Sequence, residues 1–150
     1  MIEFREGLSR HQLGVGVQMF DYAKNMLGKS DDYCLEMFVL GNIHDMGRYI
    51  FKDQSKHDIM LAKVLEDCGY KYYREVSEHS KYCSEYQSDE LNLLWFADCT
   101  VSSLGERCTF ESRLKDIESR YGTNSIEYNE TLYLVEYLRD KGFNDTFSVE

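Results

Sequence analysis

The sequence predicts one all-α domain, a helical bundle that spans residues 1–150. Apolar residues recur at three- and four-residue steps along most of the chain, and no segment alternates strictly, as a half-buried strand would. The chain contains no proline, which suits helices, because proline removes a backbone donor and interrupts them. Residues that cap helices stand at regular intervals. Together these observations indicate about seven helices.

Three helices are predicted in the first half of the chain. A serine precedes each apolar run, where its hydroxyl can accept a hydrogen bond from an unpaired backbone N–H. A glycine follows each run and can end the helix there. In the third helix the serine opens a capping box, in which Asp58 takes the third helical position. The serines and glycines that bound the three helices are Ser9 and Gly28, Ser30 and Gly47, and Ser55 and Gly69.

Four more helices are predicted in the second half. Apolar residues again repeat at helical spacing, for example Phe110, Leu114 and Ile117. The four are a helix over residues 71–82, one capped by Ser88, one from the Thr109 cap to Gly122, and one over residues 125–141. The candidate functional residues all lie between positions 9 and 122, before this last helix.

Charge and cysteine content exclude several classes of protein. The chain has 27 Asp and Glu residues against 17 Lys and Arg, a net charge of −10, so we expect no stable binding of nucleic acid, which needs a basic face. The five cysteines include no C-x-x-C pair, which argues against a zinc ribbon and favours reduced thiols in the cytoplasm. There is no apolar signal core and no apolar run of about 18 residues, so we expect no membrane segment.

Polar residues that can bind a metal ion interrupt the apolar faces. Asp98 continues the apolar face of its helix, although burial of a lone carboxylate is costly. His11 holds a similar position on the first helix, and His44-Asp45 ends an apolar helix. Imidazole nitrogens and carboxylate oxygens become stable in a core when they share a cation. Three helices that direct such residues inward would form a metal site inside the bundle.

Each of these residues also has an ordinary structural explanation. A buried histidine more often bonds to a neighbour than to a metal, and Asp98 could pair with an arginine. Two His-Asp dipeptides occur, where chance predicts about 0.3. The capping box explains His57-Asp58, and His57 could be exposed at a helix start. His44-Asp45 has no such explanation, so we interpret it as the functional pair.

Two glycines lie within the first helix. Gly14 and Gly16 follow no strand, so they do not form a phosphate-binding loop. We expect them to let another helix approach closely near His11.

The order of the histidines and aspartates resembles the H…HD…D signature of the HD-domain metal-dependent phosphohydrolases. The two other histidines fall between the HD pair and the last aspartate, as in the six-ligand version of that superfamily. Residues 96–122 are similar to small bacterial HD proteins, in which an Ala-Asp-x-Thr segment is followed by a helix ending in Arg-Tyr-Gly. The six matching positions are His11, His44, Asp45, His57, His79 and Asp98.

The resemblance implies an HD-type helical bundle with one or two divalent metal ions. Mn²⁺ and Fe²⁺ are the metals expected first, and the ligand set also admits Mg²⁺, Co²⁺, Ni²⁺ or Zn²⁺. Asp45 would bridge the two ions. The ligands implied for the first ion are His11, His44, Asp45 and Asp98, and those that complete the second are His57 and His79.

The implied reaction is hydrolysis of a phosphoester or phosphoanhydride in a nucleotide or similar small molecule. A metal ion would activate water for this reaction, with Asp45 as the central catalytic ligand. Arg48 and Lys81 are candidate cations for the developing negative charge, although both could be ordinary surface residues. Formation of homo-oligomers stays open.

Two other functions stay open. A mixed-valent di-iron oxygenase is known on the same scaffold with the same six ligands. A non-catalytic module would use the metal only to stabilise the bundle. The nearby tyrosines Tyr70, Tyr72 and Tyr73 could stack on a base, but packing in the core is the more common use of such side chains.

Overall fold

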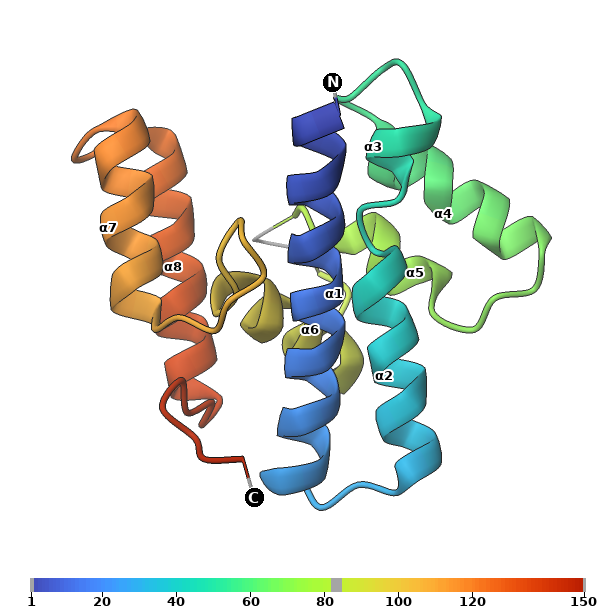
Figure 1. Ribbon diagram of the computed structural model, residues 1–150, viewed down its shortest axis with the longest axis horizontal. Coiled ribbons are helices and arrows are strands. Elements are labelled where there is room, and N and C mark those ends of the chain that lie inside the picture. Colours follow the sequence, from blue (N-terminus) through green and yellow to red (C-terminus); the bar gives the residue numbers. More distant parts are fainter. Residues whose placement is uncertain (1, 82–84, 150) are drawn as a thin grey trace.

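The computed structural model describes the backbone of residues 2–81 and 85–149, and side chains from residue 8 onwards (Figure 1). Within these residues it contains helices and a single isolated β-bridge, and no strand. The all-α prediction is therefore confirmed. The helices are α1 (Ile2–Asn25), α2 (Asp31–Ile43), α3 (Gly47–Ile50), α4 (His57–Asp67), α5 (Tyr73–Glu78), α6 (Asp89–Cys99), α7 (Phe110–Tyr121) and α8 (Ile126–Asp140).

Four of the predicted helix starts are confirmed by their hydrogen bonds. In each, the hydroxyl of the residue before the helix accepts a hydrogen bond from a backbone N–H three residues later, as an N-cap should. The pairs are Ser30 with Tyr33 at the start of α2, Ser88 with Leu91 at α6, Thr109 with Ser112 at α7, and Ser125 with Tyr128 at α8.

Two other predicted starts are wrong. Helix α1 begins at Ile2, so Ser9 lies inside it and caps nothing. Ser55 does not open a capping box either, because its hydroxyl donates to Asp53 Oδ1 at 2.6 Å and α4 begins two residues later, after Lys56. Serine and aspartate often form such local turns in place of a cap.

The predicted ends of two helices also need correction. Helix α2 ends at Ile43 rather than at Gly47, and the chain makes a tight turn through His44 and Asp45 before the single turn of α3. Helix α5 is only six residues long, shorter than the predicted helix over residues 71–82, whose last residue lies outside the described part of the chain.

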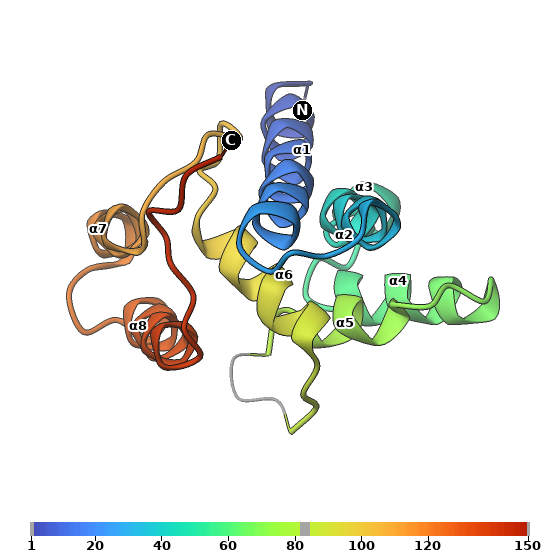
Figure 2. The same cartoon turned by 90° about the horizontal axis from the view of Figure 1, so that it is seen from below.

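Helix α6 lies at the centre of the fold. It contacts α1, α2, α5 and α8, and Figure 2 shows it between the α7–α8 pair and the helices of the first half. Most of its side chains are buried, including Leu94, Trp95 and Phe96, as expected for a helix surrounded on several sides. Asp98, near its end, is partly buried at the edge of this core.

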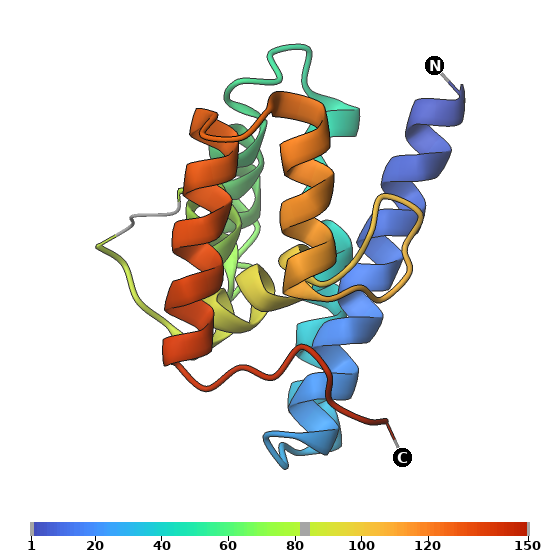
Figure 3. The ribbon, with the colours of Figure 1, turned by 90° about the vertical axis from the view of Figure 1, so that its left-hand side faces the viewer.

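The remaining helices form two groups beside α6. Helices α7 and α8 pack as an antiparallel pair, and the loop between α6 and α7 lies against α1 (Figure 3). Helices α3, α4 and α5 lie on the other side, next to the end of α2 (Figures 1 and 2). No helix in the described part of the chain is both long and apolar enough to cross a membrane.

Glycines set the spacing between α1 and α2. A Cβ on Gly41 would lie only 2.6 Å from the Cα of Gly16, and a Cβ on Gly14 would lie 2.6 Å from the carbonyl oxygen of Gly105. Gly14 thus lies against the loop between α6 and α7 rather than against a helix, whereas the expected close approach of another helix is confirmed for Gly16, which lies against Gly41 of α2. The contact brings the end of α2, with its His-Asp pair, close to α1 and His11.

Gly41→Ala is expected to destabilise the protein. Alanine favours helices more than glycine by about 1 kcal/mol, but its Cβ would meet backbone atoms of α1 that cannot move independently. Overpacking of this kind costs about 1–3 kcal/mol, so we expect a lower free energy of unfolding in urea. Val39→Ala, on the exposed side of the same helix, is the control, and an equal or smaller loss for Gly41→Ala would contradict the packing argument.

Candidate metal centre

Six predicted ligands come together in the structure, although they lie on five separate segments. One is on α1, two are in the turn after α2, one begins α4, one follows α5, and one is near the end of α6. In that order they are His11, His44 and Asp45, His57, His79, and Asp98. All four histidines of the chain are therefore in this cluster.

Asp45 joins two groups of donor atoms. Its Oδ2 lies 3.3 Å from His44 Nε2, and its Oδ1 lies 3.3 Å from both His57 Nε2 and His79 Nε2. Donor atoms of His11, His44 and Asp45 lie within 4.8 Å of one another, as do those of Asp45, His57 and His79. Each oxygen of the Asp45 carboxylate thus faces a different group.

Asp98 completes the first group. Its Oδ1 lies 2.8 Å from His11 Nε2 and 3.7 Å from His44 Nε2. The side chain of Asp98 is 27% exposed, whereas that of His44 is fully buried. The first group therefore reaches from the core towards the surface.

The four imidazole rings are all held in the same way. In each, Nδ1 is hydrogen-bonded to a backbone carbonyl oxygen, which can only accept, so Nδ1 carries the proton. Nε2 of a neutral ring is then left with its lone pair directed into the cluster, the arrangement that metal-binding histidines adopt. The four bonds, each from Nδ1 to a carbonyl oxygen, are His11 to Ser102 at 3.0 Å, His44 to Gly41 at 2.6 Å, His57 to Gln54 at 2.7 Å, and His79 to Val76 at 2.5 Å.

His44 Nε2 is buried and makes no well-directed hydrogen bond among the described residues, although carboxylate oxygens of Asp45 and Asp98 lie 3.3 and 3.7 Å away. A buried polar atom without a partner is costly and uncommon. A metal ion beside this nitrogen would remove the cost, because it would accept the lone pair. The donor set, together with a buried nitrogen that faces two carboxylates without a well-directed hydrogen bond, fits a metal ion. The cluster can hold one.

Mutual attraction shifts the pKa values of the central residues strongly. Burial alone would lower the pKa of His44, but the carboxylates of Asp45 and Asp98 raise it to about 10. Burial would raise the pKa of Asp45, yet His44 and the hydrogen bonds from His57 and His79 hold it well below its usual range. Both carboxylates are therefore ionised, since the pKa of Asp98 is also far below normal, held there against its burial by His11 and His44.

Of the two predicted cations, Arg48 is placed at the site. Its Nε lies 3.5 Å from Asp45 Oδ1, and its side chain is 39% exposed, so it stands between the cluster and solvent. The ammonium of Lys81 lies 3.5 Å from the Glu78 carboxylate on an exposed side chain. The prediction of a role for Lys81 gains no support from this contact.

Two residues that support the histidines were not found from the sequence. The Trp95 indole N–H donates to the carbonyl oxygen of His79 at 2.7 Å, whereas the sequence indicated only an apolar face. Gly47 lies against the backbone of His57, where a Cβ would collide with the His57 carbonyl group. We expected this glycine only to end a helix. His57 itself is buried, which corrects its interpretation as an exposed residue at a helix start.

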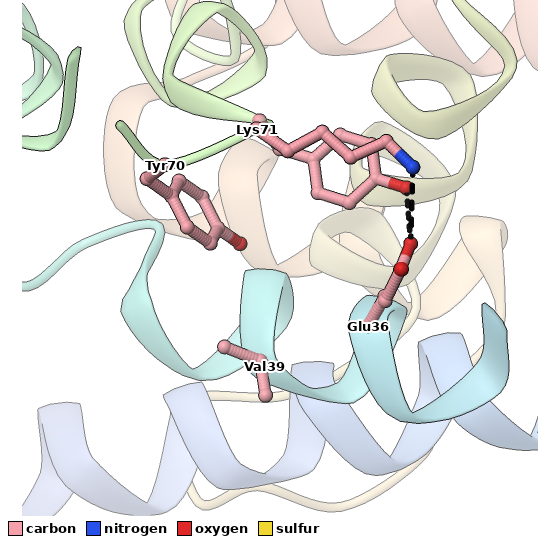
Figure 4. A pocket seen from close by; sticks show the side chains of 5 residues that line it. Glu36, Val39, Tyr70 and Lys71 are labelled. Atoms are coloured by element: carbon pink, nitrogen blue, oxygen red, sulfur yellow. Dashed lines mark hydrogen bonds and ion pairs between the residues drawn. The ribbon is translucent and has the colours of Figure 1, made fainter. Parts of the chain in front are cut away.

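The start of α5 is fixed to α2 by a separate contact. The Tyr72 hydroxyl donates to Glu36 Oε2 at 2.5 Å, and Lys71 Nζ lies 3.5 Å from the same oxygen (Figure 4). Tyr72 belongs to the hydrophobic core, and Tyr70 packs against it, beside a surface cavity of about 230 Å³. These two tyrosines therefore serve packing, and they anchor the helix that leads to His79.

Comparison with known proteins adds no assignment: no protein-family model, curated protein or solved structure matches this chain. What the protein does must therefore be inferred from the residues of the site.

Metal binding is expected to release protons near neutral pH. Because the pKa of His44 is about 10 in the metal-free protein, its ring is protonated there, and an ion on Nε2 must displace that proton. The apparent affinity for Mn²⁺ should therefore rise with pH between about 6 and 8.5. Calorimetric titration in buffers of different ionisation enthalpy gives the number of protons released per ion bound. An affinity for Mn²⁺ that does not change with pH would contradict the predicted release.

Proposed function

We propose that this protein is a metal-dependent phosphohydrolase of the HD-domain type. It would act on a nucleotide or a similar small phosphorylated molecule. The observation that carries the proposal is the bridging position of Asp45, whose two oxygens face separate groups of histidine nitrogens. A carboxylate shared in this way is what a site for two neighbouring metal ions requires.

The donor atoms favour a first-row divalent metal. Imidazole nitrogens suit iron, zinc and nickel, and carboxylates suit manganese and magnesium. The site mixes four imidazoles with two carboxylates, so Mn²⁺ or Fe²⁺ is the best match. When bound, such an ion lowers the pKa of water and polarises a phosphoryl oxygen.

The protein's own residues would orient the reaction. The carbonyl bonds to Nδ1 keep the histidine rings from turning, so the ligand geometry is set before substrate arrives. Asp45 and Asp98 supply the negative charge that attracts cations into a buried position. This local charge is consistent with the acidic character of the whole chain, which has a net charge of −10.

Arg48 is the best-placed residue to receive the substrate phosphate. Its guanidinium is close to Asp45 but half-exposed, so it can turn towards a bound phosphate once cations compensate Asp45. A guanidinium donates two parallel hydrogen bonds to phosphate oxygens. It would stabilise the negative charge that develops on the phosphoryl group.

Asp45→Asn is expected to abolish hydrolysis and to reduce the bound metal. The amide has one neutral oxygen in place of two charged ones, so it cannot serve both groups of donors. Metal content by mass spectrometry, and chromatographic detection of hydrolysis products over a panel of nucleotides, dinucleotides and phosphomonoesters with Mn²⁺, test this. Asp116→Asn, on the surface of α7, is the control.

The same panel decides between the candidate functions. Hydrolysis by Asp45→Asn at the wild-type rate would contradict the assignment of Asp45 as the bridging metal ligand. A brown wild-type protein that binds two irons and consumes O₂, with no hydrolysis, would instead identify a di-iron oxygenase. Metal binding without either activity would leave a structural metal module.

Arg48→Ala is expected to lower kcat/KM by about 100-fold, the usual effect of removing one charged donor to a transition state. The bound metal should not decrease, because Arg48 supplies no ligand atom. Arg48→Lys should recover part of the activity. Arg120→Ala, which removes an exposed arginine from α7, should behave as the wild type; an equal effect of both alanine variants would exclude a specific role for Arg48.

A further inference from the structure

The second His-Asp pair of the sequence is not explained by helix capping. Ser55 is bonded to Asp53, so no capping box involves Asp58. The Asp58 side chain is nevertheless buried, with the residue only 4% exposed. Its Oδ2 accepts a hydrogen bond from the hydroxyl of Ser80. A buried carboxylate therefore has its partner on a different element, beyond α5.

This hydrogen bond joins the neighbours of two proposed metal ligands. Asp58 directly follows His57, and Ser80 directly follows His79. The two histidines in turn approach one another across Asp45 Oδ1, with ring centroids 6.4 Å apart. The same two backbone segments are thus linked twice, once through the Asp45 carboxylate and once through Asp58 and Ser80.

The position of His79 depends on such contacts. Helix α5 has six residues, too few to be stable without tertiary contacts, and His79 lies just beyond its end. Trp95 holds the His79 carbonyl group, which connects it to α6. The hydrogen bond between Ser80 and Asp58 also connects this end of α5 to the start of α4.

We infer that Asp58 and Ser80 are a positioning pair that sets the distance between His57 and His79 for the second metal ion. The inference rests on the proposed function, since it assigns these residues to the second half of that metal site. The pair touches neither the substrate nor an ion. It acts through the backbone of the two histidines, as residues behind metal ligands commonly do.

The test is the binding of Mn²⁺ to the whole 150-residue chain, measured by calorimetry and by the metal content after dialysis. The wild type should bind two ions. Ser80→Ala and Asp58→Ala should keep the affinity for the first ion and lose about 10–100-fold in affinity for the second. The electron paramagnetic resonance signal of a coupled Mn²⁺ pair should decrease in parallel.

Three further variants separate positioning from a general loss of stability. Ser80→Thr keeps the hydroxyl and should bind both ions. Ser77→Ala removes a hydroxyl that bonds within α5, to Arg74 O, and should also bind both. The double variant of Asp58 and Ser80 should lose no more affinity than either single variant, because both remove the same interaction.

Several results would overturn the inference. Wild-type affinity for the second ion in Ser80→Ala and Asp58→Ala would do so, even if both variants melted at lower temperature. Loss of both ions from a folded Ser80→Ala variant would show that the effect is not confined to the second site. A wild type that binds one ion would overturn this inference and leave the proposed hydrolase intact, whereas a wild type that binds none would overturn both.

Discussion

The buried carboxylate of Asp45 is the constraint on which the rest of the site depends. A carboxylate in a protein interior needs compensating charge, and here three imidazole nitrogens lie 3.3 Å from its two oxygens. The three histidines come from different parts of the chain, so the turn after α2, the start of α4 and the end of α5 must meet at one point. The fold of the first half can be understood as the means of bringing them there.

Small residues and backbone carbonyl groups fix the positions of the candidate ligand side chains. Gly41 lets α2 approach α1, and its carbonyl oxygen also accepts the Nδ1 proton of His44. Gly47 lets the backbone of His57 pass close behind the Asp45 turn. Side chains larger than hydrogen at these positions would separate the helices and, with them, the ligands. Packing and chemistry therefore impose the same requirement on these glycines.

The parts of the fold that depend on local interactions were predictable from the sequence. The caps at Ser30, Ser88 and Thr109 involve residues three positions apart, and all three are present. Ser55 was misinterpreted because Asp53, two residues before it, offers a competing acceptor. Asp58 was misinterpreted for a different reason: its partner, Ser80, is far along the chain, and a pattern in one segment cannot reveal it.

The candidate site likewise has features that could be predicted from the sequence and features that could not. The order of the ligands could be read from the sequence through a resemblance, and the structure brings all six together. Arg48 could be named from the sequence because it lies three residues after Asp45. The separate positions of the two Asp45 oxygens depend on the angles between helices and could not be predicted. The central claim is that this cluster holds two metal ions bridged by Asp45. Anomalous X-ray diffraction from crystals grown with Mn²⁺ tests it most directly. The account predicts two strong peaks, one among His11, His44, Asp45 and Asp98 and one among Asp45, His57 and His79. Peaks confined to surface carboxylates, or none at the cluster, would contradict it.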